Sequence, residues 1–364
     1  MKRILVLSAL FLVLFSSGCT VPLLDIEIPF LPDIFGGVNV QEQRHDVISI
    51  ESLQAIPSSS VREGQTMRLR AVVKNLQRPE YDKTTVTIGL YNDCGLFEQP
   101  VTGEFCSGST PPKLDPNTKM VQCETTMYPQ STALVEWKLT ARGNIDVETP
   151  CKIGIMAKYK YRTFSTASVT FVNKAELERI ISEGKSFSET GTLSIGEGPV
   201  KPYIEVLSQP LVIDADTNTD VKNQGGGIMS FWIENKGGGI LEILDSSNEN
   251  VVISSSDCKS MDQNQKKLCM KVGSEFVTSI NSNGDQIAVA NCIQDHMKSK
   301  DNTGKEITSI NFIGRSTPKY SCSITAADRT RIKQELTSQI TAEIGYWYKF
   351  TKELSITVEP KIKL

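Results

Sequence analysis

The nine cysteines constrain the fold of this chain more than any other feature of its sequence. Cys19 stands alone near the start. The other eight form two sets of four, namely Cys94, Cys106, Cys123 and Cys151, and Cys258, Cys269, Cys292 and Cys322. No two of them have the Cys-x-x-Cys spacing of common zinc sites, whereas even sets are typical of disulfides in an oxidising compartment. The sequence therefore predicts an exported protein with disulfides inside each half.

Nearness along the chain predicts how these cysteines pair. Cys94 is expected to pair with Cys106, and Cys258 with Cys269. The remaining cysteines then pair as Cys123–Cys151 and Cys292–Cys322. Four cysteines allow three connectivities, so the other pairings within each set stay open.

Residues 1–18 have the pattern of a signal peptide. Lys2 and Arg3 precede an uncharged apolar stretch, Ile4–Phe15, and small residues follow it. The stretch is too short to cross a bilayer core of about 30 Å as a permanent helix. We therefore predict that residues 1–18 are cleaved off, with a single N-terminal anchor helix as the alternative.

Cys19, with Ser17 and Gly18 before it, resembles the lipid-accepting cysteine of prokaryotic lipoproteins. Ser16 departs from the family pattern, which usually has an aliphatic residue at that position. The resemblance implies a lipid on Cys19 and a location on the outer face of the cytoplasmic membrane, at the cell surface. Ordinary cleavage, which would leave Cys19 free in a secreted protein, is the alternative.

Residues 19–44 are predicted to form an extended, lipid-anchored tether. Their apolar stretch is interrupted by Pro22, Pro29 and Pro32, which prevent a helix of useful length. Such a segment can pack on the first domain, lie on the membrane or insert as a strand into a neighbouring sheet.

After the tether, the chain shows the period-2 alternation of short antiparallel strands. In Met67–Val73, for example, apolar residues alternate with Arg68 and Arg70, which gives one buried and one solvated face. A chain of 364 residues is too long for one ordinary sandwich. We therefore predict β-sandwich domains at residues 45–173 and 200–364, joined by a linker at residues 174–199.

Two short helices and a hairpin complete the predicted elements. Lys174–Phe187 places apolar residues at helical spacing opposite charged ones, so the linker is expected to hold a helix. Thr325–Leu336 combines a threonine cap with an apolar seam and predicts a second helix. A closing hairpin is expected within Ile340–Val358.

Two aromatic segments, Tyr159–Arg162 and Tyr346–Lys349, are each followed at the same distance by Ser-x-Thr. This match predicts an internal duplication, with chance resemblance of two β-rich ends as the alternative. Period two places Trp347 on the opposite side of its strand from Tyr346 and Tyr348. Core packing is the default for at least half of these rings, and a binding face is the alternative.

Arg62–Asn75 and Ile228–Gly237 resemble the second strand of the CARDB-like, immunoglobulin-like adhesion modules of archaeal and bacterial surface proteins. In those modules the strand ends in Asn-x-Gly. The first segment departs from this pattern, with Leu76 and Gln77 after its asparagine. The resemblance implies an all-β fold of two tandem immunoglobulin-like β-sandwich domains in a surface setting, with short accessory helices and intradomain disulfides.

The sequence contains little that points to catalysis. His45 and His296 are the only histidines, and neither lies in a motif. There is no nucleophile elbow, His-Glu-x-x-His helix, Walker loop or dinucleotide-binding glycine pattern. The net charge of −3 and a pI near 5.7 argue against a nucleic-acid partner. We therefore expect no enzymatic activity and no binding of nucleic acid.

One acidic loop has the spacing with which a calcium-binding loop begins, at Asp214, Asp216, Asn218 and Asp220. Thr219 replaces the glycine of such a loop, and Gly225 stands where a bidentate glutamate is needed. A solvated polar turn is the alternative. Structural calcium is the one cofactor that the sequence suggests.

Together, these features favour a non-enzymatic, membrane-anchored envelope lipoprotein. Its immunoglobulin-like modules are expected to serve adhesion or assembly with other envelope or surface proteins. The alternative is an envelope-bound ligand-binding subunit that captures a sugar, a peptide or an ion, which would need a concave cleft.

Overall fold

A computed structural model describes the chain from residue 46 onwards with several gaps. The described residues are 46–92, 95–98, 102–107, 113–115, 120–186, 191–214, 226–242, 252–253, 268–300, 306–308, 310 and 312–361. Residues 43–364 form one compact unit. The predicted signal peptide, Cys19, the tether and His45 lie outside the described residues.

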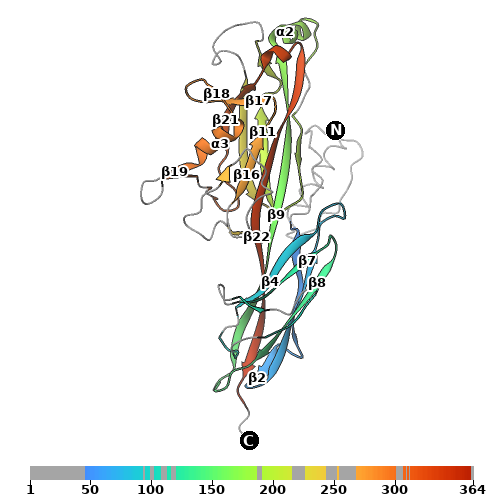
Figure 1. The fold of residues 1–364 in the computed structure, drawn as a ribbon, viewed down its shortest axis with the longest axis vertical. Helices are drawn as coiled ribbons and strands as arrows, with labels where there is room; N and C mark the ends of the chain where they lie inside the picture. Colours follow the sequence, from blue (N-terminus) through green and yellow to red (C-terminus); the bar gives the residue numbers. More distant parts are fainter. Residues whose placement is uncertain are drawn as a thin grey trace, which may run out of the picture. The chain divides into compact units, whose positions relative to one another are not determined.

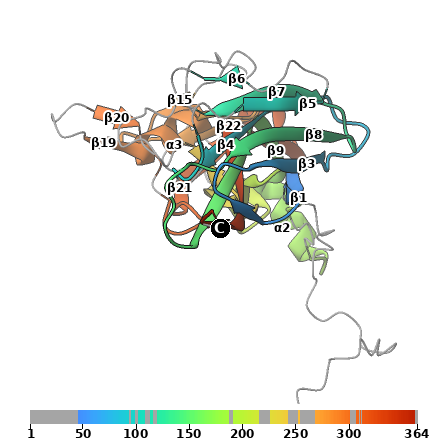
Figure 2. The ribbon, with the colours of Figure 1, turned by 90° about the horizontal axis from the view of Figure 1, so that it is seen from below.

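Within its described residues, the first half has nine strands, which form one small sheet and part of a larger one. They are β1 (Ile48–Ile56), β2 (Ser60–Arg62), β3 (Thr66–Asn75), β4 (Thr84–Asn92), β5 (Thr102–Cys106), β6 (Lys113–Leu114), β7 (Val121–Met127), β8 (Thr132–Thr140) and β9 (Thr149–Asn173). One sheet has the order β1-β3-β8-β5, and the larger sheet contains β9-β4-β7-β6. Figure 2 looks along the long strands and shows β3 and β8 beside β4 and β9.

The second half begins with helix α2 (Lys174–Ser182). Its strands are β10 (Leu193–Ile195), β11 (Val200–Leu207), β12 (Leu211–Ile213), β13 (Gly227–Asn235), β14 (Ile240–Leu241), β15 (Val252–Ile253), β16 (Cys269–Gly273), β17 (Val277–Ile280), β18 (Gln286–Ile287), β19 (Lys298–Lys300), β20 (Glu306–Thr308), β21 (Tyr320–Ala326) and β22 (Glu335–Glu359). Helix α3 (Val289–Met297) and the short 3₁₀ turn η4 (Arg329–Arg331) complete it. A five-stranded sheet has the order β11-β13-β21-β17-β18, while β16 and β22 extend the larger sheet.

The two halves repeat one strand plan. An immunoglobulin-type sandwich has the sheets A-B-E-D and C-F-G. In the first half, the A-B-E-D sheet is β1-β3-β8-β5, and strands C and F are β4 and β9. In the second half, the A-B-E-D sheet is β11-β13-β21-β17, and strands C and F are β16 and β22. The all-β sandwich fold with short accessory helices is confirmed, although only one of the two described helices lies where the sequence predicted it. The repeated strand order supports the predicted internal duplication.

The seventh strand of each sandwich comes from the other half. β9 and β22 are 25 residues long each and pair antiparallel without a bulge from Glu335↔Val172 to Val358↔Thr149. They run side by side in Figure 1, in green and red. The last part of β22 lies next to the part of β9 that pairs with β4, so it is the G strand of the first sandwich. In the same way, the last part of β9 lies next to the part of β22 that pairs with β16 and is the G strand of the second sandwich. Each half therefore completes the other.

Four tyrosines form the core at the centre of this pair. Tyr159 pairs with Tyr348 and Tyr161 with Tyr346, and all four rings are buried. Ring centroids lie 5.8 Å apart for Tyr159 and Tyr348 and 6.3 Å apart for Tyr161 and Tyr346. Trp347 lies half-exposed on the opposite face, with Nζ of Lys158 4.8 Å from its ring centroid. The default prediction that half of these aromatic residues pack in the core is confirmed.

The hydroxyls of the tyrosines join the long strands to both sandwiches. Tyr348 donates to Oδ1 of Asn235 at the end of β13 and accepts from the backbone of Gly239, at 2.9 Å each. In the corresponding place in the first half, Asn75 at the end of β3 contacts Gln77, which donates to the hydroxyl of Tyr161. Burial raises the pKa of Tyr161 to about 12, so these hydroxyls stay protonated at neutral pH.

Several predicted elements differ from those observed. α2 confirms the helix in the linker, but Thr325–Leu336 spans the end of β21, the turn η4 and the start of β22. The hairpin predicted within Ile340–Val358 is a single straight strand. β22 stays straight because β9 pairs with it from Glu335 to Val358, so no turn interrupts it.

The division into domains at residues 45–173 and 200–364 stays a prediction, and strands pair across it. Residues at the end of β22, assigned to the second domain, pair with Thr149–Met156 of the first. Part of the predicted linker belongs to the larger sheet, because β10 pairs with β9 over Leu193–Ile195. Among the described residues, neither helix is long and apolar enough to span a membrane.

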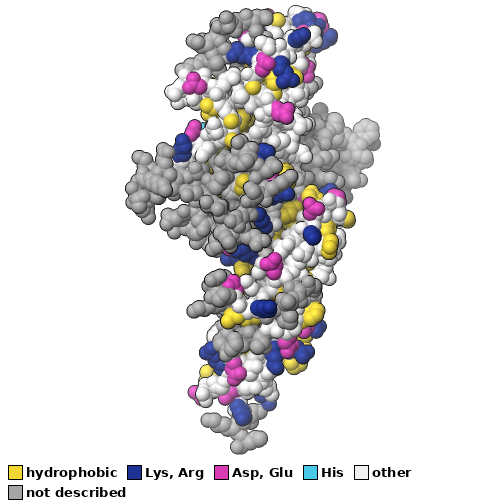
Figure 3. All heavy atoms as spheres, viewed as in Figure 1, with side chains coloured by type: hydrophobic (Ala, Val, Ile, Leu, Met, Phe, Trp, Pro, Cys, Tyr) yellow, Lys and Arg dark blue, Asp and Glu magenta, His cyan; other side chains and the backbone are white. Residues whose placement is uncertain are grey.

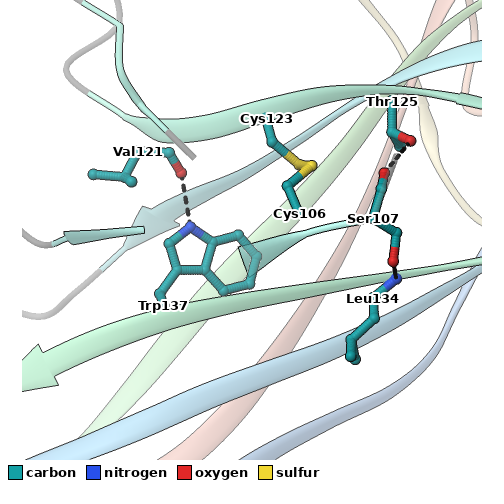
Figure 4. Close-up of a disulfide and its surroundings, with 7 residues drawn as sticks. All are labelled: Cys106, Ser107, Val121, Cys123, Thr125, Leu134 and Trp137. Atoms are coloured by element: carbon teal, nitrogen blue, oxygen red, sulfur yellow. Dashed lines mark hydrogen bonds between the residues drawn. A yellow bond between two sulfur atoms is a disulfide. The ribbon is translucent and has the colours of Figure 1, made fainter. Parts of the chain in front are cut away.

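The disulfides correct half of the predicted pairing. Cys106 in β5 bonds Cys123 in β7, so the predicted pairs Cys94–Cys106 and Cys123–Cys151 are wrong. Figure 4 shows this bond between strands of the two different sheets, beside Trp137, whose indole donates to the carbonyl of Val121. Nearness along the chain failed here because the sandwich brings β5 and β7 together.

In the second half, Cys292 in α3 bonds Cys322 in β21, which confirms that predicted pair. Cys151 and Cys269 are disulfide-bonded too, and their partners lie outside the described residues. The Cys258–Cys269 pair stays a prediction. Closing loops of 17 and 30 residues removes entropy from the unfolded chain and contributes roughly 3 to 4 kcal/mol for each bond.

We expect the two halves to stay together when the chain is cut between them. A site for a sequence-specific protease inserted at residues 187–190 leaves the β9–β22 pair intact, so both fragments should elute together in native size exclusion and unfold in one transition. A non-reducing denaturing gel of the cut protein is the control and should show two separate fragments. Separation of the fragments without denaturant would contradict the shared pairing.

We expect Tyr348→Phe to lower the free energy of unfolding by about 1–3 kcal/mol, because it leaves buried partners of the hydroxyl unsatisfied. Tyr159→Phe is the matched control. The hydroxyl of Tyr159 makes no hydrogen bond among the described residues and only approaches the backbone of Val47. Urea denaturation of both variants measures the difference, and equal losses would show that the hydroxyl of Tyr348 contributes nothing specific.

Candidate binding face

The sequence-predicted site residues are only partly described. Asp214 is half-buried and attracts Arg329 electrostatically, whereas Asp216, Asn218 and Asp220 lie outside the described residues. The calcium site therefore stays a prediction. His296 lies on α3, where its Nε2 is 2.9 Å from the carbonyl oxygen of Ser321.

The outward face of β11, β13 and β21, here called the binding face, has an unusual mixture of side chains. Alternate residues of these strands point away from the core and form rows across the sheet. The rows pair Tyr203 with Trp232, Glu205 with Ser230, and Leu207 with Ile228. Leu207 is 42% exposed and Ile228 is 48% exposed. Apolar and aromatic side chains thus lie on the outward side of this sheet, around the buried Ser230.

The aromatic row is a stack of two rings on neighbouring strands, β11 and β13. The rings of Tyr203 and Trp232 are nearly parallel, with an interplanar angle of 7° and centroids 5.0 Å apart. Nζ of Lys319, beside β21, lies 4.2 Å from the centroid of the Trp232 ring. Nζ of Lys236 lies 5.9 Å from the Tyr203 ring on the other side. Cation–π attraction therefore fixes both rings in place at the surface.

Carboxylates hold the two lysines of this stack. Lys319 forms an ion pair of 2.8 Å with Glu205, and Lys236 pairs with Glu234. Partial burial acts to raise the pKa of Glu234, but hydrogen bonds from Lys236 and the indole of Trp232 outweigh it and lower the pKa below its ordinary value. Burial raises the pKa of Tyr203. These contacts hold the two lysines beside the rings.

The equivalent face of the first half serves as an internal comparison. There, the outward side of β1, β3, β8 and β5 is crossed by complementary ion pairs, which are Lys74–Glu51, Arg70–Glu136 and Arg68–Glu104. Phe105 is its large exposed apolar residue. The outward faces of these two equivalent sheets thus differ. The face in the first half carries rows of ion pairs, and the binding face carries a ring stack and an exposed apolar pair.

Charge alone does not distinguish these regions. Figure 3 shows acidic and basic side chains intermingled over the side of the molecule that it displays. Both signs occur within each sheet face, as the ion pairs above illustrate. The binding face is therefore recognised by its aromatic and apolar residues.

This face was not among the sites predicted from the sequence. Ile228–Gly237 carries a resemblance to adhesion modules, which by itself does not mark a face. The alternation of Ile228, Ser230, Trp232 and Glu234 was a usable signal, because it places large apolar groups on the side that a sandwich leaves to solvent.

Comparison with known proteins adds little. No protein-family model and no curated protein matches the chain. Among solved structures, the crystal structure of collagen adhesin (CNA) from S. aureus aligns with 88% of this chain and 96% of its own, at 9% identity and a TM-score of 0.12. A score this low carries no inference about fold or function, and the resemblance to CARDB-like modules stays a prediction.

Proposed function

We propose that this chain is a non-enzymatic lipoprotein of a prokaryotic envelope that binds another envelope or surface protein through the binding face. The observation that carries the proposal is the contrast between the two equivalent sheet faces. One is covered by ion pairs, and the other carries the Tyr203–Trp232 stack and the exposed pair Leu207–Ile228.

The composition of the binding face suits a protein partner. Aromatic residues are enriched at the centres of protein interfaces, where a few of them supply most of the binding energy, and polar groups lie at the rim. Ile228 and Trp232 would form such a centre, and the lysine–carboxylate pairs would form the rim. Small molecules are usually bound in concave sites instead of on an open sheet face.

Display at a surface would follow from the predicted lipid on Cys19 and the tether. A lipid-anchored tether would leave the domains free to meet partners outside the membrane. Disulfides in both halves agree with an oxidising compartment.

We expect Ile228→Asp to weaken partner binding by about 30-fold or more, because a charge in the centre of an interface removes a hot spot of about 2 kcal/mol. The measurement is quantitative cross-linking from intact envelopes, followed by titration of the captured protein on purified variants. Phe105→Asp is the matched control, since Phe105 is 46% exposed on the equivalent face of the first half. A partner that is lost equally from both variants, or from neither, would rule out this face.

We expect Cys19→Ala to release the protein from the membrane fraction, because the lipid would have no attachment point. Mass spectrometry of the native N-terminus should find Cys19 as the first residue and carrying a lipid. Ser17→Ala keeps both the cysteine and a small residue before it, and it should remain membrane-bound. Retention of Met1 on the mature chain would refute both cleavage and anchoring by a lipid on Cys19.

A further inference from the structure

Cys292, Cys322 and His296 form a cluster that the sequence analysis did not foresee. Cys292 and His296 are one helical turn apart on α3, and Cys322 lies opposite them on β21. One ligand atom from each residue lies within 4.8 Å of the other two. Both sulfurs are buried, while the imidazole is exposed. This is a Cys₂His donor set whose two sulfurs are joined as a disulfide.

The hydrogen bond of His296 prepares its ring to be a ligand. A carbonyl oxygen can only accept, so Nε2 of His296 carries the proton and donates it to the backbone of Ser321 at 2.9 Å. Nδ1 then has a free lone pair. Metal-binding histidines commonly donate their second ring nitrogen to a backbone carbonyl in this way, which fixes the tautomer and the ring orientation. The ring also stacks on Tyr320, with centroids 6.4 Å apart.

We propose that the reduced form of this cluster binds one Zn²⁺ ion through Cys292, Cys322 and His296. A dithiol reductant would transfer two electrons and two protons to the Cys292–Cys322 disulfide, giving two thiols and the oxidised, cyclic reductant. Zn²⁺ then displaces both thiol protons. Two thiolates and a neutral imidazole leave the zinc site with no net charge and with a fourth position open to water.

The required movements are small. Tetrahedral zinc, with bonds of about 2.3 Å to sulfur and 2.0–2.1 Å to nitrogen, separates its ligand atoms by roughly 3.5–3.8 Å. The sulfurs, which are 2.07 Å apart in the disulfide, would separate, and the imidazole would move inwards from a distance of at most 4.8 Å. Rotation of the side chains on α3 supplies this movement without displacing β21. The disulfide thus acts as a switch that excludes the metal when it is oxidised.

The test is a titration of the full chain with Co²⁺, a spectroscopic substitute for Zn²⁺. The protein is reduced with a dithiol, separated from it without oxygen, and titrated while the thiolate-to-cobalt absorption is followed. Reduced wild type should bind one cobalt ion with this absorption and lose it to Zn²⁺, and the oxidised protein should show none. His296→Ala, an exposed position that leaves the core unchanged, should weaken binding at least tenfold.

The matched control removes the other described disulfide. Cys106→Ser with Cys123→Ser should keep the absorption, and Cys292→Ser with Cys322→Ser should abolish it. Absence of the absorption in the reduced wild type would overturn the proposal. So would its survival in the Cys292/Cys322 variant, because the metal would then be held by other thiols of a loosened chain.

Discussion

The antiparallel pairing of β9 with β22 is the interaction on which the rest of this structure depends. Each half supplies six strands of an immunoglobulin-type sandwich and takes its seventh from the other half. Neither half alone could cover the edge of its long strand, which would leave a row of unpaired backbone groups. The four tyrosines at the centre of the pair add buried ring contacts and hydrogen bonds to both sandwiches. The two repeats are therefore bound by the same backbone ladder that builds their sheets.

This shared ladder also determines which surfaces stay available. It covers the edges of the C-F-G sheets of both sandwiches with each other, so the sheet faces, among them the outward faces of the two A-B-E-D sheets, are left for solvent and partners. On the first, ion pairs satisfy the charges within the sheet itself. On the second, Tyr203 and Trp232 stack beside exposed Ile228. Burial of such groups against a partner gains more free energy than burial of paired charges, whose desolvation cost offsets their attraction.

One strand connects the binding face with the thiol–imidazole cluster. β21 carries Cys322 towards the interior, and the backbone carbonyl of its Ser321 accepts the hydrogen bond of His296. The hydroxyl of Ser321 lies 3.4 Å from that of Ser230 on the binding face. Residues 321 and 322 of β21 thus contact both the binding face and the cluster.

The sequence by itself determined the all-β class and the repeated tyrosines, because alternation and local spacing are properties of the chain. It offered Cys292–Cys322 as one of the connectivities that four cysteines allow. Only the tertiary structure decided the rest. It joined Cys106 to Cys123 because the two sheets of a sandwich bring distant strands together, and it made one straight strand of the predicted hairpin because β9 offers a partner along its whole length. The binding face and the Cys₂His cluster were not predicted from the sequence for the same reason, because each is assembled from elements that are remote along the chain.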